Sequence, residues 1–377
     1  MFATSMLKVC SLYTHANLHI DYFNYTNHTI FEIPVPSKPD ENDYITDIAV
    51  SNDGFNLAVL TALSKQLTVY DLVQTKQLKT FALPRSASRL RFTIDNIHIL
   101  VADKSGDILL FNIKSDNPGI KLLGHLSLLL DVLQTNNSKY IVSCDRDEKI
   151  RVSCYPNTYN IQTYCLGHKE FVNHIELLPH NDNYLTSSSG DGTVKIWNFI
   201  DGKLCHTIDT TDYVKDEQSK QNFVNMMDDS GIEVFALPIV HYSISSTDKC
   251  SSILAVTVLS CNTIFIFSLT IVGNSFVHEL KYKLELEMSP TAVKLFKDSL
   301  FVFDETKSCV SIYKLVVKND MISVQHSNNV VMFESQVGIS ESKQSTQLEA
   351  IKVLYKRKFD NVQEYQERKK QRLEKAT

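Results

Sequence analysis

Short runs of alternating apolar and polar residues, separated by turn-forming residues, recur along most of the chain. Four residues close such runs at a regular spacing: Tyr70, Phe111, Ser153 and Trp197 follow one another at 41, 42 and 44 residues. Period-two alternation is typical of β-strands with one buried face. A repeat of about 40–45 residues is typical of the four-stranded sheets of a β-propeller. The pattern therefore predicts an all-β ring of sheets.

The repeat continues more weakly on both sides of this region. Phe267 and Tyr313 close similar runs, 70 and 46 residues further along. The long interval contains residues 209–231, which are rich in Asp, Lys, Gln and Asn, and we interpret this segment as an insertion loop. A degenerate run at residues 18–22, about one period before Tyr70, supplies a further sheet. The expected number of sheets is seven.

Residues 167–198 contain the most complete copy of the repeat, a WD repeat that begins with Gly-His and closes with Ile-Trp-Asn. A second Gly-His pair, with His125, lies 43 residues upstream. In such a repeat His168, Asp191, Ser187 and Trp197 can form one hydrogen-bonded set between packed sheets, where an unpaired polar atom costs about 1–3 kcal/mol. His125, His168, Asp191 and Trp197 are therefore interpreted as structural residues.

The composition fits one large domain. The chain has 377 residues, of which 43% are hydrophobic. We expect a seven-bladed propeller over residues 1–355 and a short basic helix or tail over residues 356–377. No strongly amphipathic helix is expected before that tail, and no apolar leader or membrane-spanning run is apparent.

Candidate chemistry is sparse. The eight cysteines and twelve histidines show no metal-ligand spacing, and the cysteines are expected to be reduced and to pack in strands. No phosphate-binding loop, nucleophile elbow or zinc-protease motif occurs. We expect a non-catalytic protein without a cofactor or metal of its own.

Charge is divided unevenly along the chain. Residues 352–375 carry a net charge of +5, and the rest of the chain carries −10. An acidic body binds nucleic acid poorly, because affinity for phosphates depends on Lys and Arg. The tail is either a solvated charged helix or a basic segment that contacts RNA phosphates or a partner, with Lys369, Lys370 and Arg372 as candidates. Its basic clusters also favour a nuclear location.

One turn departs from the ordinary repeat. Where Gly-Asp-Gly-Thr is usual, residues 146–149 read Arg-Asp-Glu-Lys, and Arg151 follows between Ile150 and Val152. Alternation places Arg151 on the opposite strand face from its apolar neighbours. Lys149 and Arg151, followed by Glu148, are candidate partner contacts, since Arg is enriched at binding hot spots. The alternative is that the two cations pair with Asp145 or Glu148 within the same sheet.

Several segments together resemble the non-catalytic WD-repeat subunit of the eukaryotic tRNA (guanine-N7)-methyltransferase, the Wuho-type family. They are residues 102–107, 123–132, 145–153, 165–172, 187–193 and 354–362, the last containing Tyr-Lys-Arg-Lys-Phe-Asp-Asn-Val. Between residues 210 and 345 only the repeat pattern agrees.

The resemblance implies a propeller that binds the side of a catalytic methyltransferase subunit. That partner would carry S-adenosylmethionine and form N7-methylguanosine in the tRNA variable loop, with tRNA bound mainly through the complex and no membrane involved. The family's contact region for the partner corresponds to the charged segment around Glu148, Lys149 and Arg151. The alternative function is a general WD-repeat scaffold in a nuclear ubiquitin-ligase, nuclease or chromatin complex.

Overall fold

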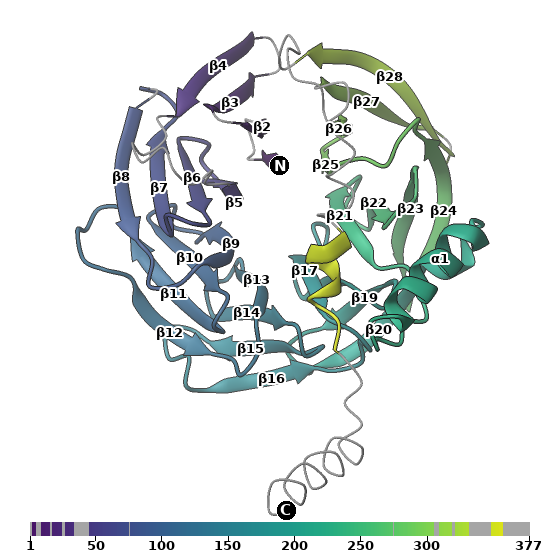
Figure 1. Ribbon diagram of the computed structural model, residues 1–377, viewed down its shortest axis with the longest axis horizontal. Helices are drawn as coiled ribbons and strands as arrows, with labels where there is room; N and C mark the ends of the chain where they lie inside the picture. The colour runs from purple at the N-terminus through teal and green to yellow at the C-terminus, as the bar shows by residue number, and fades with distance from the viewer. Residues whose placement is uncertain are drawn as a thin grey trace, which may run out of the picture.

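The computed structural model describes residues 45–74, 76–273, 275–304, 309–318, 321–331 and 348–356, and the backbone of four strands within residues 2–33. The strands of these residues form seven four-stranded antiparallel sheets, each built from four consecutive strands. The sheets stand around a central channel, with the first strand of each sheet innermost (Figure 1). The predicted all-β propeller with seven sheets is confirmed.

The first four sheets comprise β1–β4 (Phe2–Thr4, Val9–His15, Asn17–Asn24, Asn27–Ile33), β5–β8 (Ile45–Val50, Asn56–Thr61, Gln66–Asp71, Lys76–Ala82), β9–β12 (Ala87–Phe92, His98–Asp103, Asp107–Asn112, Ile120–Gly124) and β13–β16 (Leu129–Gln134, Tyr140–Asp145, Ile150–Cys154, Ile161–Cys165). The last three comprise β17–β20 (Val172–Leu177, Tyr184–Ser189, Thr193–Asn198, Lys203–Asp209), β21–β24 (Ile239–Ser246, Ser251–Val258, Thr263–Val272, Ser275–Glu285) and β25–β28 (Ala292–Phe296, Ser299–Asp304, Cys309–Lys318, Met321–Val331). Strand β1 contacts both β5 and β25, so the first sheet stands between the second and the seventh.

The periodic residues of the sequence lie at one position in the third strand of their sheets. Each faces a Leu or Ile of the second strand that is fully buried: Tyr70–Leu57, Phe111–Ile99, Ser153–Ile141, Trp197–Leu185, Phe267–Leu254 and Tyr313–Leu300. Burying such an aliphatic side chain contributes about 1.5–3 kcal/mol. The repeat is therefore a packing repeat, and residues 18–22 fall in β3, the third strand of the first sheet, as predicted.

Residues 209–231 are not the loop that the sequence suggested. They contain the 3-10 helix η1 (Thr210–Asp212) and the α-helix α1 (Glu217–Asp228), a mostly polar helix with two buried residues, so this segment is partly helical. Asp216 caps α1 by accepting a hydrogen bond from the Ser219 backbone N–H at 3.0 Å. Phe223 and Met227, four residues apart on one helix face, are buried in the core that joins the fifth and sixth sheets.

Residues 348–356 form a segment that we call the C-terminal strap. It begins with a short helical turn and runs outward over the fifth sheet (Figure 1). Tyr355 anchors it, with only 4% of its surface exposed, and its hydroxyl donates to the Gly190 carbonyl at 2.8 Å. The Tyr355 ring packs edge-on against Phe171 at 5.0 Å between centroids. The predicted helix within residues 356–377 lies outside the described residues, except for Lys356.

Candidate functional site

In two neighbouring sheets a histidine of the loop before the first strand contacts an aspartate and a serine from the second strand or the turn after it. His168 Nδ1 lies 2.9 Å from Asp191 Oδ2, and its Nε2 lies 2.7 Å from Ser187 Oγ. Trp197 Nε1 donates to the same Ser187 oxygen at 2.8 Å, which completes the predicted hydrogen-bonded set. In the fourth sheet His125 lies 2.8 Å from both Asp145 Oδ2 and Ser143 Oγ.

Burial and pairing act in opposite directions on the two ionisable groups of the fifth sheet. Burial lowers the pKa of His168, although Asp191 favours its protonated form. Burial also disfavours the Asp191 carboxylate, yet the hydrogen bonds from His168 and Thr193 hold its pKa below the usual value. The carboxylate is the stable form, and it orders two loops by accepting from the backbone N–H groups of Lys169 and Thr193, each at 2.9 Å.

The turn between the second and third strands has a left-handed residue at the same position in four sheets, and in the second sheet this residue is Lys65, with φ of +51°. In the next three sheets of described side chains the equivalent residues are Gly106, Glu148 and Gly192, with φ of +102°, +63° and +76°. Such angles cost a residue with a Cβ atom roughly 1–2 kcal/mol, and glycine avoids this cost. A Cβ at Gly192 would also lie 2.9 Å from Ala236 Cβ, so that turn requires glycine. Glu148 is therefore a charged side chain held in an unfavourable backbone conformation.

The predicted contact residues of the fourth sheet differ in exposure. Lys149 is exposed, and its backbone N–H donates to Asp145 Oδ1 at 3.2 Å. Arg151 is half-buried between buried Ile150 and Val152, as the alternation predicted. Its guanidinium donates to Ser153 Oγ and to the Gly124 and Thr158 carbonyls at 2.9, 3.1 and 3.3 Å. In the described part of the chain neither cation pairs with an acidic side chain, so the alternative of pairing with Asp145 or Glu148 is wrong.

Glu148 pairs with the strap. Lys356 Nζ lies 2.5 Å from Glu148 Oε1 and 3.6 Å from Asp147 Oδ1. Although burial opposes it, the pairing with Glu148 raises the pKa of Lys356. Glu170 lies in the same electrostatic environment, where its burial and then the charges of Glu148 and Asp191 raise its pKa to about 7. The charged turn and the strap therefore form one ionic cluster.

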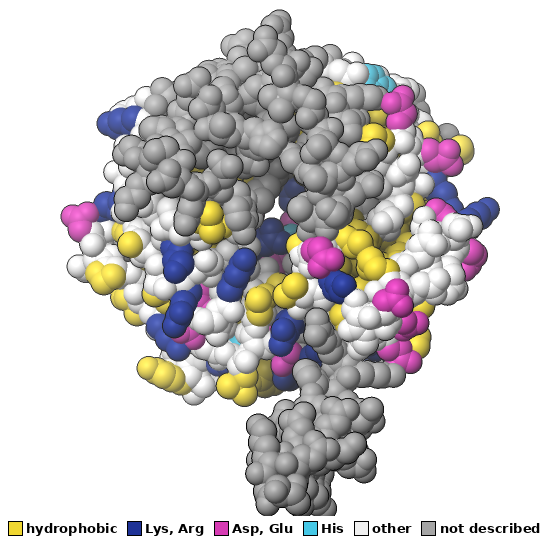
Figure 2. All heavy atoms as spheres, viewed as in Figure 1, with side chains coloured by type: hydrophobic (Ala, Val, Ile, Leu, Met, Phe, Trp, Pro, Cys, Tyr) yellow, Lys and Arg dark blue, Asp and Glu magenta, His cyan; other side chains and the backbone are white. Residues whose placement is uncertain are grey.

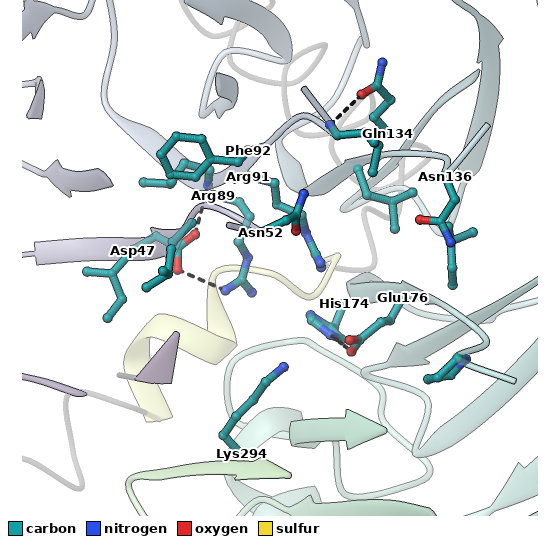
Figure 3. Close-up of a pocket in the computed structure, with 18 of the residues that line it drawn as sticks. Asp47, Asn52, Arg89, Arg91, Phe92, Gln134, Asn136, His174, Glu176 and Lys294 are labelled. Carbon is teal, nitrogen blue, oxygen red and sulfur yellow. Dashed lines mark hydrogen bonds and ion pairs between the residues drawn. The ribbon is translucent and has the colours of Figure 1, made fainter. Parts of the chain in front are cut away.

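A second polar cluster lines the central channel and was not anticipated from the sequence. Figure 3 shows Arg89, Arg91, His174, Glu176 and Lys294 around a cavity of about 410 Å³. The buried Asp131 carboxylate accepts from Arg91 at 2.6 Å and from the Ile175 backbone N–H at 3.0 Å. Burial opposes its ionisation, but Arg91 and His174 keep its pKa well below the usual range. Because these charges largely satisfy one another across the innermost strands, the cluster ties three sheets together.

The described residues offer little else for chemistry. They contain no group of three or more His, Cys, Asp or Glu side chains arranged to hold a metal ion. The seven cysteines with described side chains are free thiols. No helix in the described ranges is both long and apolar enough to cross a membrane. Lys369, Lys370 and Arg372, the candidate RNA contacts, lie outside the described residues.

Comparison with known proteins relates the chain to one family. The family model described as the tRNA methyltransferase TRM82 WD40 domain matches residues 26–121 and 114–331. The "tRNA (guanine-N(7)-)-methyltransferase non-catalytic subunit wuho" of Drosophila ananassae is 31% identical over 344 residues, which is 88% of this chain and 77% of the relative.

Other alignments are shorter and more similar. The protein of the same name from Drosophila mojavensis is 42% identical over 162 residues, which is 42% of each chain. The "tRNA (guanine-N(7)-)-methyltransferase non-catalytic subunit wdr4" of Danio rerio is 38% identical over 49% of this chain and 45% of its own. Some of these alignments therefore span less than half the length of the relatives.

A solved structure supports the fold alone. A chain in the "Crystal Structure of Mitotic Checkpoint Complex" superposes with a TM-score of 0.63, covering 80% of this chain and 86% of its own, at 15% sequence identity.

Proposed function

The chain belongs to the family of the tRNA methyltransferase TRM82 WD40 domain, and we propose that it is the non-catalytic subunit of a tRNA (guanine-N7)-methyltransferase. Its role in this proposal is to bind a separate catalytic subunit and hold it in an active form. That subunit carries S-adenosylmethionine and forms N7-methylguanosine in the tRNA variable loop.

The main structural support for a partner contact is the charged turn of the fourth sheet. Lys149 is an exposed cation beside a left-handed glutamate, at a position where the neighbouring sheet has the neutral Gly192-Thr193. A partner surface with a carboxylate can pair with Lys149 without displacing an existing ion pair. We therefore assign the direct contact to Lys149, with Glu148 beside it.

Arg151 acts differently in this proposal. Two of its three hydrogen bonds connect β15, the strand that follows the charged turn, to the Gly124 and Thr158 carbonyls, and these bonds hold that strand in place. It is a positioning residue, and its replacement lowers both partner affinity and the stability of the isolated chain.

Co-expression with the catalytic subunit tests the proposal. The two chains should form an active one-to-one complex, and this chain alone should bind no S-adenosylmethionine. Lys149→Glu should reduce the affinity at least about tenfold, because it places like charges across the contact. Lys139→Glu is the matched control, since Lys139 is exposed at the opposite end of the same sheet. Equal affinities of the two variants would remove Lys149 from the interface.

The basic tail is the proposed route to tRNA, and its basic clusters also support a proposed nuclear location. Lys369, Lys370 and Arg372 would contact phosphates, whereas the acidic body would not. Deleting residues 360–377 should weaken tRNA binding by the intact complex and flatten its dependence on salt concentration. A salt slope equal to that of the full complex would contradict an RNA contact by the tail.

A further inference from the structure

The C-terminal strap lies on the face of the molecule shown in Figure 2, and a groove runs along it. The groove has a volume of about 560 Å³ and is lined by Arg146, Ile232, Glu349, Lys352, Val353, Tyr355 and Lys356. We call it the strap groove. The strap forms one wall of the groove. Arg146 of the charged turn and Ile232, which follows α1, line the rest of it.

The strap groove has an apolar floor and an apolar rim. Ile232 and Tyr355 are 2% and 4% exposed and form fixed parts of the core. Val353, in contrast, leaves 65% of its surface exposed at the groove. Covering an aliphatic side chain of this kind stabilises a complex, because it removes apolar surface from water.

The charges around the groove are incompletely balanced. Arg146 Nε is buried without a hydrogen-bond acceptor, and its contact with Asp147 Oδ1 is 4.0 Å long. Lys352 Nζ also lies 4.0 Å from its acidic neighbour, Glu349 Oε1. Lys356 is already neutralised by Glu148 and Asp147. Two cations with long ion-pair contacts therefore face the groove, and they favour a carboxylate.

The groove is held in shape before any partner arrives. Tyr355 is fixed by its hydrogen bond to Gly190 and by the ring of Phe171. The ring of Phe223 in α1 also lies 6.2 Å from the Tyr355 ring. Lys356 closes the outer end of the strap through its ion pair with Glu148. A preorganised surface loses little conformational entropy on binding, which strengthens association.

We propose that the strap groove receives a segment of the catalytic subunit in which an aliphatic side chain stands next to an Asp or Glu. The aliphatic side chain covers Val353, and the carboxylate pairs with Arg146 and Lys352. This proposal rests on the proposed function, because it extends the contact at Lys149 across Glu148 and Lys356 to the strap.

Affinity measurements on the two purified full-length subunits test the groove. Lys352→Glu and Val353→Glu should each weaken binding about tenfold, since each adds a negative charge next to the partner's carboxylate. Val73→Glu is the matched control: Val73 is also 65% exposed but belongs to the turn after β7 in the second sheet. It should bind as the unchanged chain does, and all three variants should unfold at the same temperature as the unchanged chain.

A photoreactive benzoylphenylalanine at position 353 identifies the occupant within the assembled complex. Attachment to a catalytic-subunit peptide with an acidic residue beside Val, Leu or Ile supports the proposal. Attachment to tRNA, to a second copy of this chain, or to no protein overturns it. If Lys149→Glu abolishes assembly while Lys352→Glu and Val353→Glu bind normally, the groove is excluded and the proposed function stands. If the unchanged subunits do not associate, the proposed function itself fails.

Discussion

The fourth and fifth sheets follow one structural plan and use it differently. Both fix a loop histidine with a serine and an aspartate, and both place a left-handed residue at the same turn position. In the fifth sheet that residue is Gly192, packed against Ala236, whereas in the fourth it is Glu148, paired with Lys356. The buried histidine, serine and aspartate therefore stabilise the fold in both sheets, and the turn residue is free to be a charged side chain that can bind a partner.

The largest expected difference between the two sheets is in the stability lost when the closing residue of the third strand is replaced by alanine. Trp197 is fully buried and bonded to Ser187, so Trp197→Ala should lower the free energy of unfolding by about 3–5 kcal/mol. Ser153 is its counterpart in the fourth sheet, and Ser153→Ala should lower the free energy of unfolding by only about 1 kcal/mol. Urea unfolding measures both changes. Tyr159→Ala, at a 91% exposed position, is the control and should change little.

Replacing Asp145 should affect both stability and partner binding, whereas replacing Asp191 should affect stability alone. Asp191→Ala and Asp145→Ala should each destabilise the chain by about 2–3 kcal/mol, because each leaves a buried histidine without its acceptor. Asp145 also accepts from the Lys149 backbone N–H, so only its replacement should misplace Lys149 and weaken partner binding as well. Unfolding curves and subunit affinities would be compared at one pH. Equal affinities for the two variants would contradict this division.

The pKa of Glu170 depends on charges from both sheets, Glu148 of the fourth and Asp191 of the fifth. Its pKa is raised to about 7, so the folded chain binds a proton that the unfolded chain lacks between about pH 4.5 and 7. The contribution of Glu170 to stability therefore declines as the pH rises through this window. Glu170→Gln should match the unchanged chain below pH 4.5 and exceed it by roughly 1 kcal/mol above pH 7, a value reduced for solvent screening. A difference independent of pH would contradict the raised pKa.

The smallest expected change concerns the left-handed residue of the fourth sheet. Glu148→Gly removes an unfavourable backbone conformation and an exposed ion pair, so its net gain in stability should be about 0.5–1 kcal/mol. The same variant should weaken partner binding, since Lys356 and Lys149 lose the side chain between them. Thermal unfolding and subunit affinity test the two effects separately. A loss of stability would mean that the pair with Lys356 outweighs the backbone cost.

The sequence predicted the fold better than the site. Trp197 and its counterparts mark a packing position that recurs in the six sheets whose side chains are described, so their spacing was sufficient to place six third strands. Helix α1 was missed because its polar composition concealed Phe223 and Met227, although their spacing of four and the cap at Asp216 are helical signals.

The contacts that shape the site were harder to predict. Lys149 and Glu148 could be selected from their departure from the usual turn, but the roles of Arg151 and Tyr355 depend on segments distant in sequence. Arg151 reaches Gly124, and Tyr355 reaches Gly190 across 165 residues. The channel charges had a local signal, since Arg89 and Arg91 alternate with buried Leu90 and Phe92, yet only the ring brings Asp131 beside them.

The Tyr355–Gly190 hydrogen bond can form only late in synthesis, because it joins the fifth sheet to a segment near the C-terminus. Each sheet comes from consecutive strands, so the fourth and fifth sheets can assemble while a ribosome is still translating the remainder of the message. The strap, at residues 348–356, is made only after the strands of all seven sheets have been synthesised. A truncated product that ends before residue 348 can therefore contain every sheet and still lack the finished docking wall.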